Sequence, residues 1–182
     1  MSISKQDLDE ARKQVIRLTD KLGNPIDPGI LDLVTVLRLL GINTTGSCEG
    51  HLGRFTSGPY IMFQSPLAKK LCDEIWEETD SITAKYKKKY QAAEKYNVYE
   101  LQKMYILLDG FYENRNTPTN HHLIVRCFGA SFATLMCQGA DLANILAKKE
   151  QKDLLEKNQL EMKAFMDYLI KEAPSAPPVG GR

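Results

Sequence analysis

The chain has 182 residues, 43% of them hydrophobic, which is enough for one sizeable core. Its 24 basic and 23 acidic residues give a formal net charge of +1, which excludes recruitment of nucleic acid or an anionic membrane by a global electrostatic field. The four cysteines are too scattered for a disulfide-stapled fold, and we find neither a secretory leader nor an apolar run of about 20 residues, so we expect a cytoplasmic protein with free thiols.

The first two helices are marked by their apolar spacing and their ends. Apolar residues recur every three or four positions over residues 5–22, which predicts an amphipathic helix that ends at Gly23. Asp27 followed by Pro28 predicts the start of a second helix, with aspartate as its N-cap. This helix, residues 29–40, is apolar on nearly every side and should lie at the centre of the core.

Short strands and a long helix follow. The alternating, β-branched residues 42–45 predict a strand that ends near Ser47 and Cys48, and a glycine-rich loop separates it from a second strand at residues 60–63. Helical spacing over residues 67–96 predicts one helix of about eight turns, long for a globular protein.

The second half of the chain predicts two more strands and then helices. Residues 104–108 are apolar without a gap and precede Asp109-Gly110, so we expect a third strand there, and residues 121–128 alternate as a fourth strand. Helical patterns begin again at Ser131 and continue in a long C-terminal helix. The fold class is therefore α+β: a small, mostly antiparallel sheet of about four strands packed by helices. We expect one domain over residues 1–172 and a disordered tail over residues 173–182.

The loop that follows the first strand brings a thiol, a carboxylate and an imidazole together in five residues, Ser47-Cys48-Glu49-Gly50-His51. A strand that ends in a glycine turn points backbone N–H groups outward, and such concavities bind phosphate or carboxylate oxygens. His51 and Arg54 would add charge, and the fourth strand could bring polar side chains to the same place. The predicted ligand-binding residues are Ser47, Cys48, Glu49, Gly50, His51, Arg54, His122 and Arg126.

Two other interpretations of this loop stay open. Cys48 could be a nucleophile that His51 activates, although the sequence shows no third residue to orient the imidazole. Cys48-x-x-His51 also resembles half of a zinc site that His121, His122 or Cys127 might complete. Because no second pair of ligands accompanies it, we predict no metal site.

The segment Thr44-Thr45-Gly46-Ser47-Cys48-Glu49-Gly50-His51 and the later strand Leu123-Ile124-Val125-Arg126-Cys127 resemble the tRNA wybutosine-synthesis methyltransferase family. Members of that family carry a Thr-Thr-Ser-Ser-Cys-x-Gly-Arg loop at an equivalent place. In this chain Gly46 replaces a serine and His51 the arginine. The resemblance implies a protein that handles RNA or nucleotides, with S-adenosylmethionine as cofactor and Ser47, Cys48 and Gly50 at the site. The Ser-Cys-x-Gly-His loop is also similar to loops of small phage and bacterial proteins.

These observations predict that the loop from Cys48 to Arg54 binds, or also modifies, a nucleotide, a nucleotide-derived ligand or an RNA element. The alternative is a protein without enzymatic activity that sequesters a small ligand or contacts another protein. In either case the long helices could join copies of the chain into a homo-oligomer, and we expect no membrane contact.

Overall fold

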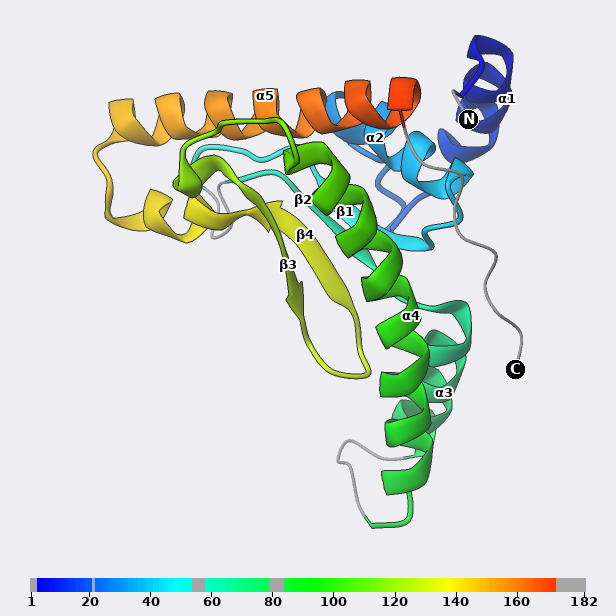
Figure 1. Cartoon of the computed structure of the whole chain (residues 1–182). Helices are drawn as coiled ribbons and strands as arrows, with labels where there is room; N and C mark the ends of the chain where they lie inside the picture. The colour runs from blue at the N-terminus through cyan, green and yellow to red at the C-terminus, as the bar shows by residue number, and fades with distance from the viewer. Residues whose placement is uncertain (1–2, 21, 54–57, 79–83, 173–182) are drawn as a thin grey trace.

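A computed structural model describes residues 3–20, 22–53, 58–78 and 84–172, and the fold is α+β. One four-stranded antiparallel sheet is combined with α-helices and two short 3-10 helices (Figure 1). The helices are α1 (Lys5–Val15), α2 (Pro28–Leu39), α3 (Pro66–Glu78), α4 (Lys87–Tyr112), η1 (Thr119–His121), η2 (Gln138–Ile145) and α5 (Lys148–Glu172). The strands are β1 (Thr44–Cys48), β2 (Tyr60–Phe63), β3 (Leu123–Cys127) and β4 (Ala133–Cys137).

The order of the strands in the sheet is β1-β2-β4-β3. Cys48 pairs with Tyr60, Tyr60 with Met136, and Met136 with Ile124, so one row of the sheet runs from the end of β1 to the middle of β3. Neighbouring strands lie about 4.8 Å apart, which puts β3 roughly 14 Å from β1. Residues on β3 are therefore far from the loop after β1.

The core lies between one face of the sheet and the helices α2, α4 and α5. Ile61, Phe63 and Leu135 supply the sheet side and are almost fully buried. From the helices, Leu37, Met104 and Phe165 pack against them. Each of these helices has apolar residues at three- and four-residue spacing, so each buries one side against the same face of the sheet.

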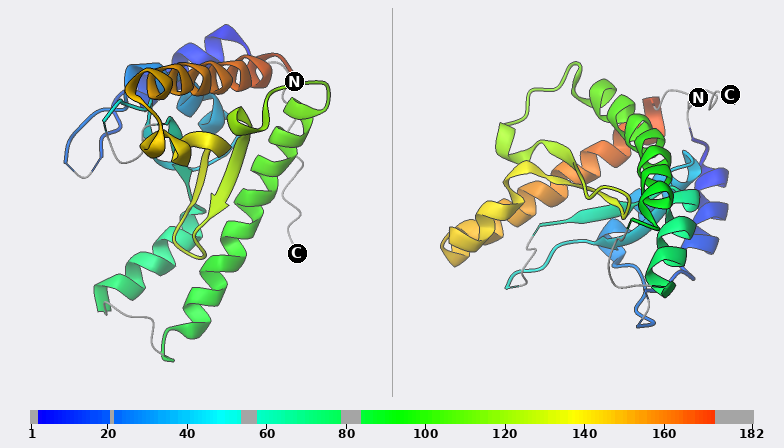
Figure 2. Two further views of the ribbon diagram at one scale, coloured as in Figure 1. Left: turned by 90° about the vertical axis from the view of Figure 1, so that its left-hand side faces the viewer. Right: turned by 90° about the horizontal axis from the view of Figure 1, so that it is seen from below.

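Helices α3 and α4 form a hairpin that extends beyond the sheet (Figure 2). Its small core contains Ala68, Cys72 and Ala93. Lys89 contacts Glu74 at 2.9 Å, an exposed ion pair of modest value. Lys85 pairs likewise with Glu78, so two of the four lysines in the segment 85–89 contact glutamates of α3.

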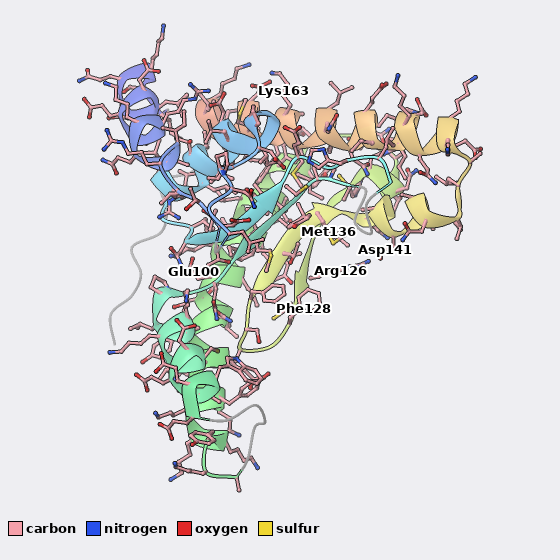
Figure 3. All side chains as sticks on the ribbon, turned by 180° about the vertical axis from the view of Figure 1, so that it is seen from behind. Glu100, Arg126, Phe128, Met136, Asp141 and Lys163 are labelled. Carbon is pink, nitrogen blue, oxygen red and sulfur yellow. The ribbon has the colours of Figure 1, made fainter. Side chains whose placement is uncertain are left out.

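The opposite face of the sheet has no helix in front of β3 and β4 in the part of the chain that the structure describes (Figure 3). Met136 lies on this face in the middle of the sheet, and Arg126 bonds Asp141 at its rim. Phe128 stacks against Phe132 at the tip of the β3–β4 hairpin, with ring centroids 4.8 Å apart.

The predicted α+β class and the small antiparallel sheet are confirmed, but two predicted elements are wrong. Residues 104–108 belong to α4, where Met104, Leu107 and Leu108 share the buried face of a helix. The predicted helix after Ser131 begins instead with strand β4, all five residues of which are buried. Because β4 lies between β2 and β3 and all five of its residues are buried, its sequence shows no alternation of apolar and polar residues and cannot be told from a buried helix by period alone.

Three boundaries also differ from the prediction. The first helix ends at Val15 rather than Leu22, and Thr19 then forms an isolated bridge with Pro25. The single helix expected over residues 67–96 is two helices, α3 and α4. The strand after α2 spans Thr44–Cys48 and includes Cys48 itself. The tail at residues 173–182 lies outside the described residues.

None of the helices in the described ranges combines the length and the apolar character needed to cross a membrane.

Candidate functional site

The site is built where the start of α2 meets the end of β1. Helix α2 has 12 residues and so rises about 18 Å, while the five residues of β1 extend about 17 Å. Because the chain reverses between them, the strand returns to the level at which the helix began. The side chain of Asp27, just before α2, therefore lies beside Cys48, the last residue of β1.

The N-terminus of α2 is stabilised by a residue from the loop instead of its own N-cap. Asp27 occupies the N-cap position, but its side chain makes no capping hydrogen bond. The carboxylate of Glu49 takes that role, because its Oε2 accepts the N–H of Gly29 at 2.7 Å. A carboxylate at this position also interacts favourably with the helix dipole. The Asp27 carboxylate is thereby left to face the loop.

Two glycines leave the space that Glu49 needs to cap α2 in place of Asp27. A Cβ atom on Gly29 would lie 2.6 Å from the Glu49 carboxylate, so a larger residue would push the carboxylate away. Gly50 has a φ of 87°, a backbone conformation that glycine adopts without strain, and its N–H points to the Cys48 sulfur at 3.4 Å. The turn therefore favours glycine at position 50, and the contact of Glu49 with the start of α2 favours glycine at position 29.

Asp27 is the hub of a three-residue cluster with Cys48 and His51. Its Oδ2 atom accepts the N–H of Glu49 at 3.1 Å and lies 3.3 Å from His51 Nε2. Cys48 also interacts with this carboxylate through a side-chain hydrogen bond. One donor atom from each of Asp27, Cys48 and His51 lies within 4.8 Å of the other two.

Burial and hydrogen bonds act in opposite directions on the Asp27 carboxyl group. Partial burial raises its pKa, but the bonds from Glu49, His51 and Cys48 together outweigh that effect, so the pKa lies below the ordinary value. Asp27 is thus a carboxylate at neutral pH. Cys48 is 7% exposed, whereas the side chains of Asp27 and His51 are about a third exposed, at 32% and 33%. The cluster has one buried wall and one side open to solvent.

The loop is also fixed to the C-terminal helix. Gln159 on α5 donates its side-chain N–H to the backbone oxygen of Glu49 at 3.0 Å. Beside this contact lies a cleft of about 660 Å³ between α2 and α5, with Glu49, Asp32, Glu156 and Lys163 among its polar lining residues. Three carboxylates and one ammonium group do not favour an anion in this cleft by charge alone.

The structure brings together only part of the predicted binding set. Cys48 and His51 converge, with Gly50 in the turn between them, while Glu49 points away from them to cap α2. Ser47 lines a separate pocket of about 220 Å³ that also includes Arg38 and Thr44. Arg54 lies outside the described residues.

The two residues predicted from the later strand lie elsewhere. His122 stacks on Tyr112 of α4 with ring centroids 4.5 Å apart, and its Nε2 donates to the Thr117 oxygen at 2.6 Å. Arg126 bonds Asp141 at the start of η2. Both contacts are on the β3 side of the sheet, which β2 and β4 separate from β1 and its loop.

Sequence reasoning missed Asp27 as a member of the site because the Asp-Pro pair reads as a simple helix start. A signal was available in the lengths of the two elements. A 12-residue helix followed by a reversal and a short strand returns the chain to its starting level, and this would have placed Asp27 against the Cys48 loop.

The arrangement of the cluster limits its chemistry. In a cysteine–histidine–aspartate nucleophile system the imidazole lies between the thiol and the carboxylate. Here the carboxylate of Asp27 contacts both Cys48 and His51, so the imidazole is not interposed. A central cation surrounded by a thiolate, an imidazole and a carboxylate uses all three groups without requiring that order.

The sequence matches no family model, and neither the curated proteins nor the solved structures gave a significant match.

Proposed function

We propose that the protein binds a divalent transition metal ion, of the class of Zn²⁺, through Asp27, Cys48 and His51. The observation that carries this proposal is the convergence of three ligand types, from two separate segments, with donor atoms within 4.8 Å of one another. Zinc is bound in proteins by cysteine sulfur, histidine nitrogen and carboxylate oxygen. This proposal departs from the sequence-based prediction of no metal, which lacked the third ligand.

The distances suit such an ion. Zinc–ligand distances of about 2.0–2.3 Å in a tetrahedral shell separate neighbouring donor atoms by about 3.5 Å. His51 Nε2 and the Asp27 oxygen are 3.3 Å apart. Small side-chain rotations would bring the remaining donors to that spacing. Thiolate and imidazole together favour zinc, cobalt, nickel or iron over magnesium or calcium.

The charges suit it as well. The Asp27 carboxylate and a Cys48 thiolate would repel each other across a short distance in the absence of a cation. A divalent ion neutralises both. It would also supply the positive charge that an anionic ligand requires in a neighbourhood rich in carboxylates. A nucleotide or RNA ligand, and S-adenosylmethionine, stay predictions from the sequence.

Cobalt substitution tests the metal site directly. The protein is treated with a chelator, dialysed and titrated with Co²⁺, whose absorption reports its ligands. We expect one equivalent to bind, with visible d–d bands of tetrahedral intensity and a near-ultraviolet sulfur-to-cobalt charge-transfer band. Stoichiometric zinc in the purified protein would agree with this result.

Matched variants assign the ligands. Cys48→Ser should abolish the sulfur-to-cobalt band, and Asp27→Asn or His51→Gln should weaken binding more than about 100-fold, beyond the 10- to 100-fold typical of outer-shell changes. Cys127→Ser replaces an exposed cysteine on β3 and should leave the spectrum unchanged. If Cys48→Ser retains the band, or if folded wild-type protein binds no cobalt, the proposal is wrong.

A further inference from the structure

The side of the cluster that faces solvent bears on what a bound metal could do. The cluster has three members among the described residues. Structural zinc sites are closed by four protein ligands, whereas sites that bind or transform a ligand keep one position for it. A structural site here would need a fourth protein ligand beside Asp27, Cys48 and His51.

The other ligand-type side chain of the loop is already engaged. The Glu49 carboxylate is held by the N–H of Gly29 at 2.7 Å, on the α2 side of the loop. To reach the cluster it would have to leave the helix N-terminus, which would remove the cap of α2. Glu49 is thus kept out of the metal shell by a bond that also stabilises α2.

The histidines that could have completed a zinc site are engaged as well. His121 Nδ1 pairs with Asn158 Oδ1 at 3.0 Å, and His122 Nε2 donates to the Thr117 oxygen. Cys137 is fully buried and bonds the Asn158 oxygen. Cys137 is on β4, two strands from β1 in the sheet, and the two histidines precede β3, three strands from β1, so none of the three lies beside Cys48.

The exposure of the three ligands indicates the side from which a fourth ligand could reach the metal. Cys48 forms the buried wall, and Asp27 and His51 each leave about a third of the side chain in solvent. A fourth ligand would therefore approach from the solvent side, opposite the sulfur.

The charge of the loaded site admits an anionic oxygen as that ligand. A divalent ion with one thiolate, one carboxylate and a neutral imidazole has a formal charge of zero, so an incoming anion meets no net repulsion from the inner shell. A second carboxylate in the shell would have made the site anionic, and Glu49 is withheld from it. Phosphate and carboxylate oxygens can then replace a metal-bound water.

We propose that a metal ion held by Asp27, Cys48 and His51 keeps one coordination position open for an anionic oxygen donor, the phosphate or carboxylate group of a small ligand. This inference depends on the metal site proposed above. It names the part of the ligand that is recognised, the anionic oxygen, and it makes the site one for ligand exchange instead of a structural staple.

The cobalt-loaded protein provides the test, because its d–d bands respond to a change of the fourth ligand. Inorganic phosphate, acetate and adenosine monophosphate are titrated separately against it at constant ionic strength and pH. We expect a saturable change of the d–d bands with the sulfur-to-cobalt band retained. Sodium perchlorate, a weakly coordinating salt, is the control and should leave the bands unchanged.

The outcomes separate the two proposals. A cobalt spectrum with the sulfur band that no added anion alters would overturn the open position and would leave the metal site standing. Absence of the sulfur band in folded protein would remove the metal site and the open position with it. If adenosine monophosphate binds more than about tenfold tighter than phosphate, equal to about 1.4 kcal/mol, the ligand is of the nucleotide class, and equal affinities assign recognition to the phosphate oxygen alone.

A matched variant checks the role of Glu49. In Glu49→Gln the amide oxygen can still accept the Gly29 N–H, so the cap is retained while the charge is lost. We expect the anion-induced change in the d–d bands to persist in this variant. Its loss would mean that Glu49 takes part in ligand binding and would contradict the argument that it is held apart.

Discussion

Two regions of the molecule concentrate chemically versatile side chains, and they use them in different ways. Around β1, Asp27, Cys48 and His51 converge and leave a solvent-facing side. Around β3, Arg115 binds Glu161 through two hydrogen bonds, at 3.1 and 2.6 Å, and the Tyr112 hydroxyl donates to the same carboxylate at 2.9 Å. The second region is the richer one in hydrogen bonds, but its central carboxylate, Glu161, is only 5% exposed.

The difference shows that density of polar residues is a poor guide to a site. The tandem histidines His121 and His122 stand out in the sequence, yet each has a hydrogen-bond partner inside the fold. The Asp27 carboxylate, which the sequence assigns to a helix cap, is freed by Glu49 and becomes the centre of the candidate site. What distinguishes the two regions is solvent exposure: the side chains of Asp27 and His51 are about a third exposed, whereas that of Glu161 is 5% exposed.

The comparison is tested most strongly by removing Arg115. The Glu161 side chain is 5% exposed, so Arg115→Ala leaves a buried carboxylate without its cation, and we expect the free energy of unfolding to fall by about 3 kcal/mol. Urea denaturation measures this loss. Arg126→Ala is the control, because both partners of its ion pair with Asp141 are at least 40% exposed, and it should cost less than about 1 kcal/mol. Similar losses in the two variants would contradict the distinction between buried and exposed pairs.

A substitution of Glu49 affects both stability and the candidate site. Glu49→Ala removes the capping bond to Gly29 and one anchor of the loop, so we expect a loss of about 1 kcal/mol in unfolding free energy. Cobalt affinity should fall roughly 10- to 100-fold, as for residues that orient metal ligands. In Glu49→Gln the unfolding free energy and the cobalt affinity should both stay close to those of the wild type. A fully unchanged cobalt affinity in Glu49→Ala would show that the loop holds its shape without this anchor.

Alkaline pH tests the buried thiol of the β3 region. Burial raises the pKa of Cys137 to about 12, from an ordinary value of 9.0. The unfolded chain therefore releases this proton at lower pH than the folded chain does, so the contribution to stability is complete below pH 9.0 and is lost as pH rises through about 12. The decline from this group is at most about 1.4 kcal/mol per pH unit. Cys137→Ala should show a shallower decline between these values in urea denaturation at several pH values, and an equal slope would refute the assignment.

Thiol labelling gives the smallest and simplest comparison. Cys127 is exposed, whereas Cys48, Cys72 and Cys137 are buried, so one thiol should react quickly with a maleimide in folded protein. Cys48 should react more slowly still after addition of Zn²⁺, because its sulfur would be metal-bound. Peptide mass spectrometry assigns the labelled positions. Labelling of Cys48 at the same rate with and without Zn²⁺ would count against its role as a ligand.

Much of the fold could be predicted because, in several segments, the spacing of apolar residues agrees with the residues that start or stop a helix or strand. The apolar helix after Asp27 and the strand at Tyr60–Phe63 follow directly from their patterns. Strand β4 could not be recognised, since all its residues are buried and its apolar run has no alternation. Residues 104–108 were misassigned because an uninterrupted apolar pentad hides the helical spacing that continues to Phe111.

The candidate site was half predictable for a related reason. Cys48 and His51 are neighbours in sequence, and their spacing across a turn is visible without a structure. Asp27 reaches them only because α2 and β1 have nearly the same length and opposite directions. The sequence pattern does not give the order of the strands in the sheet, and His122 and Arg126 lie away from the site because β2 and β4 separate β3 from β1.

The exchange between Asp27 and Glu49 at the start of α2 has a consequence for how the protein would respond to its surroundings. Because Glu49 caps α2 without using any of the three proposed ligands, the start of this helix would fold without the ion. With the proposed metal site, the chain could lose and regain an ion as a folded molecule. Occupancy would follow the supply of free metal, and the added stability would grow only with the logarithm of that supply.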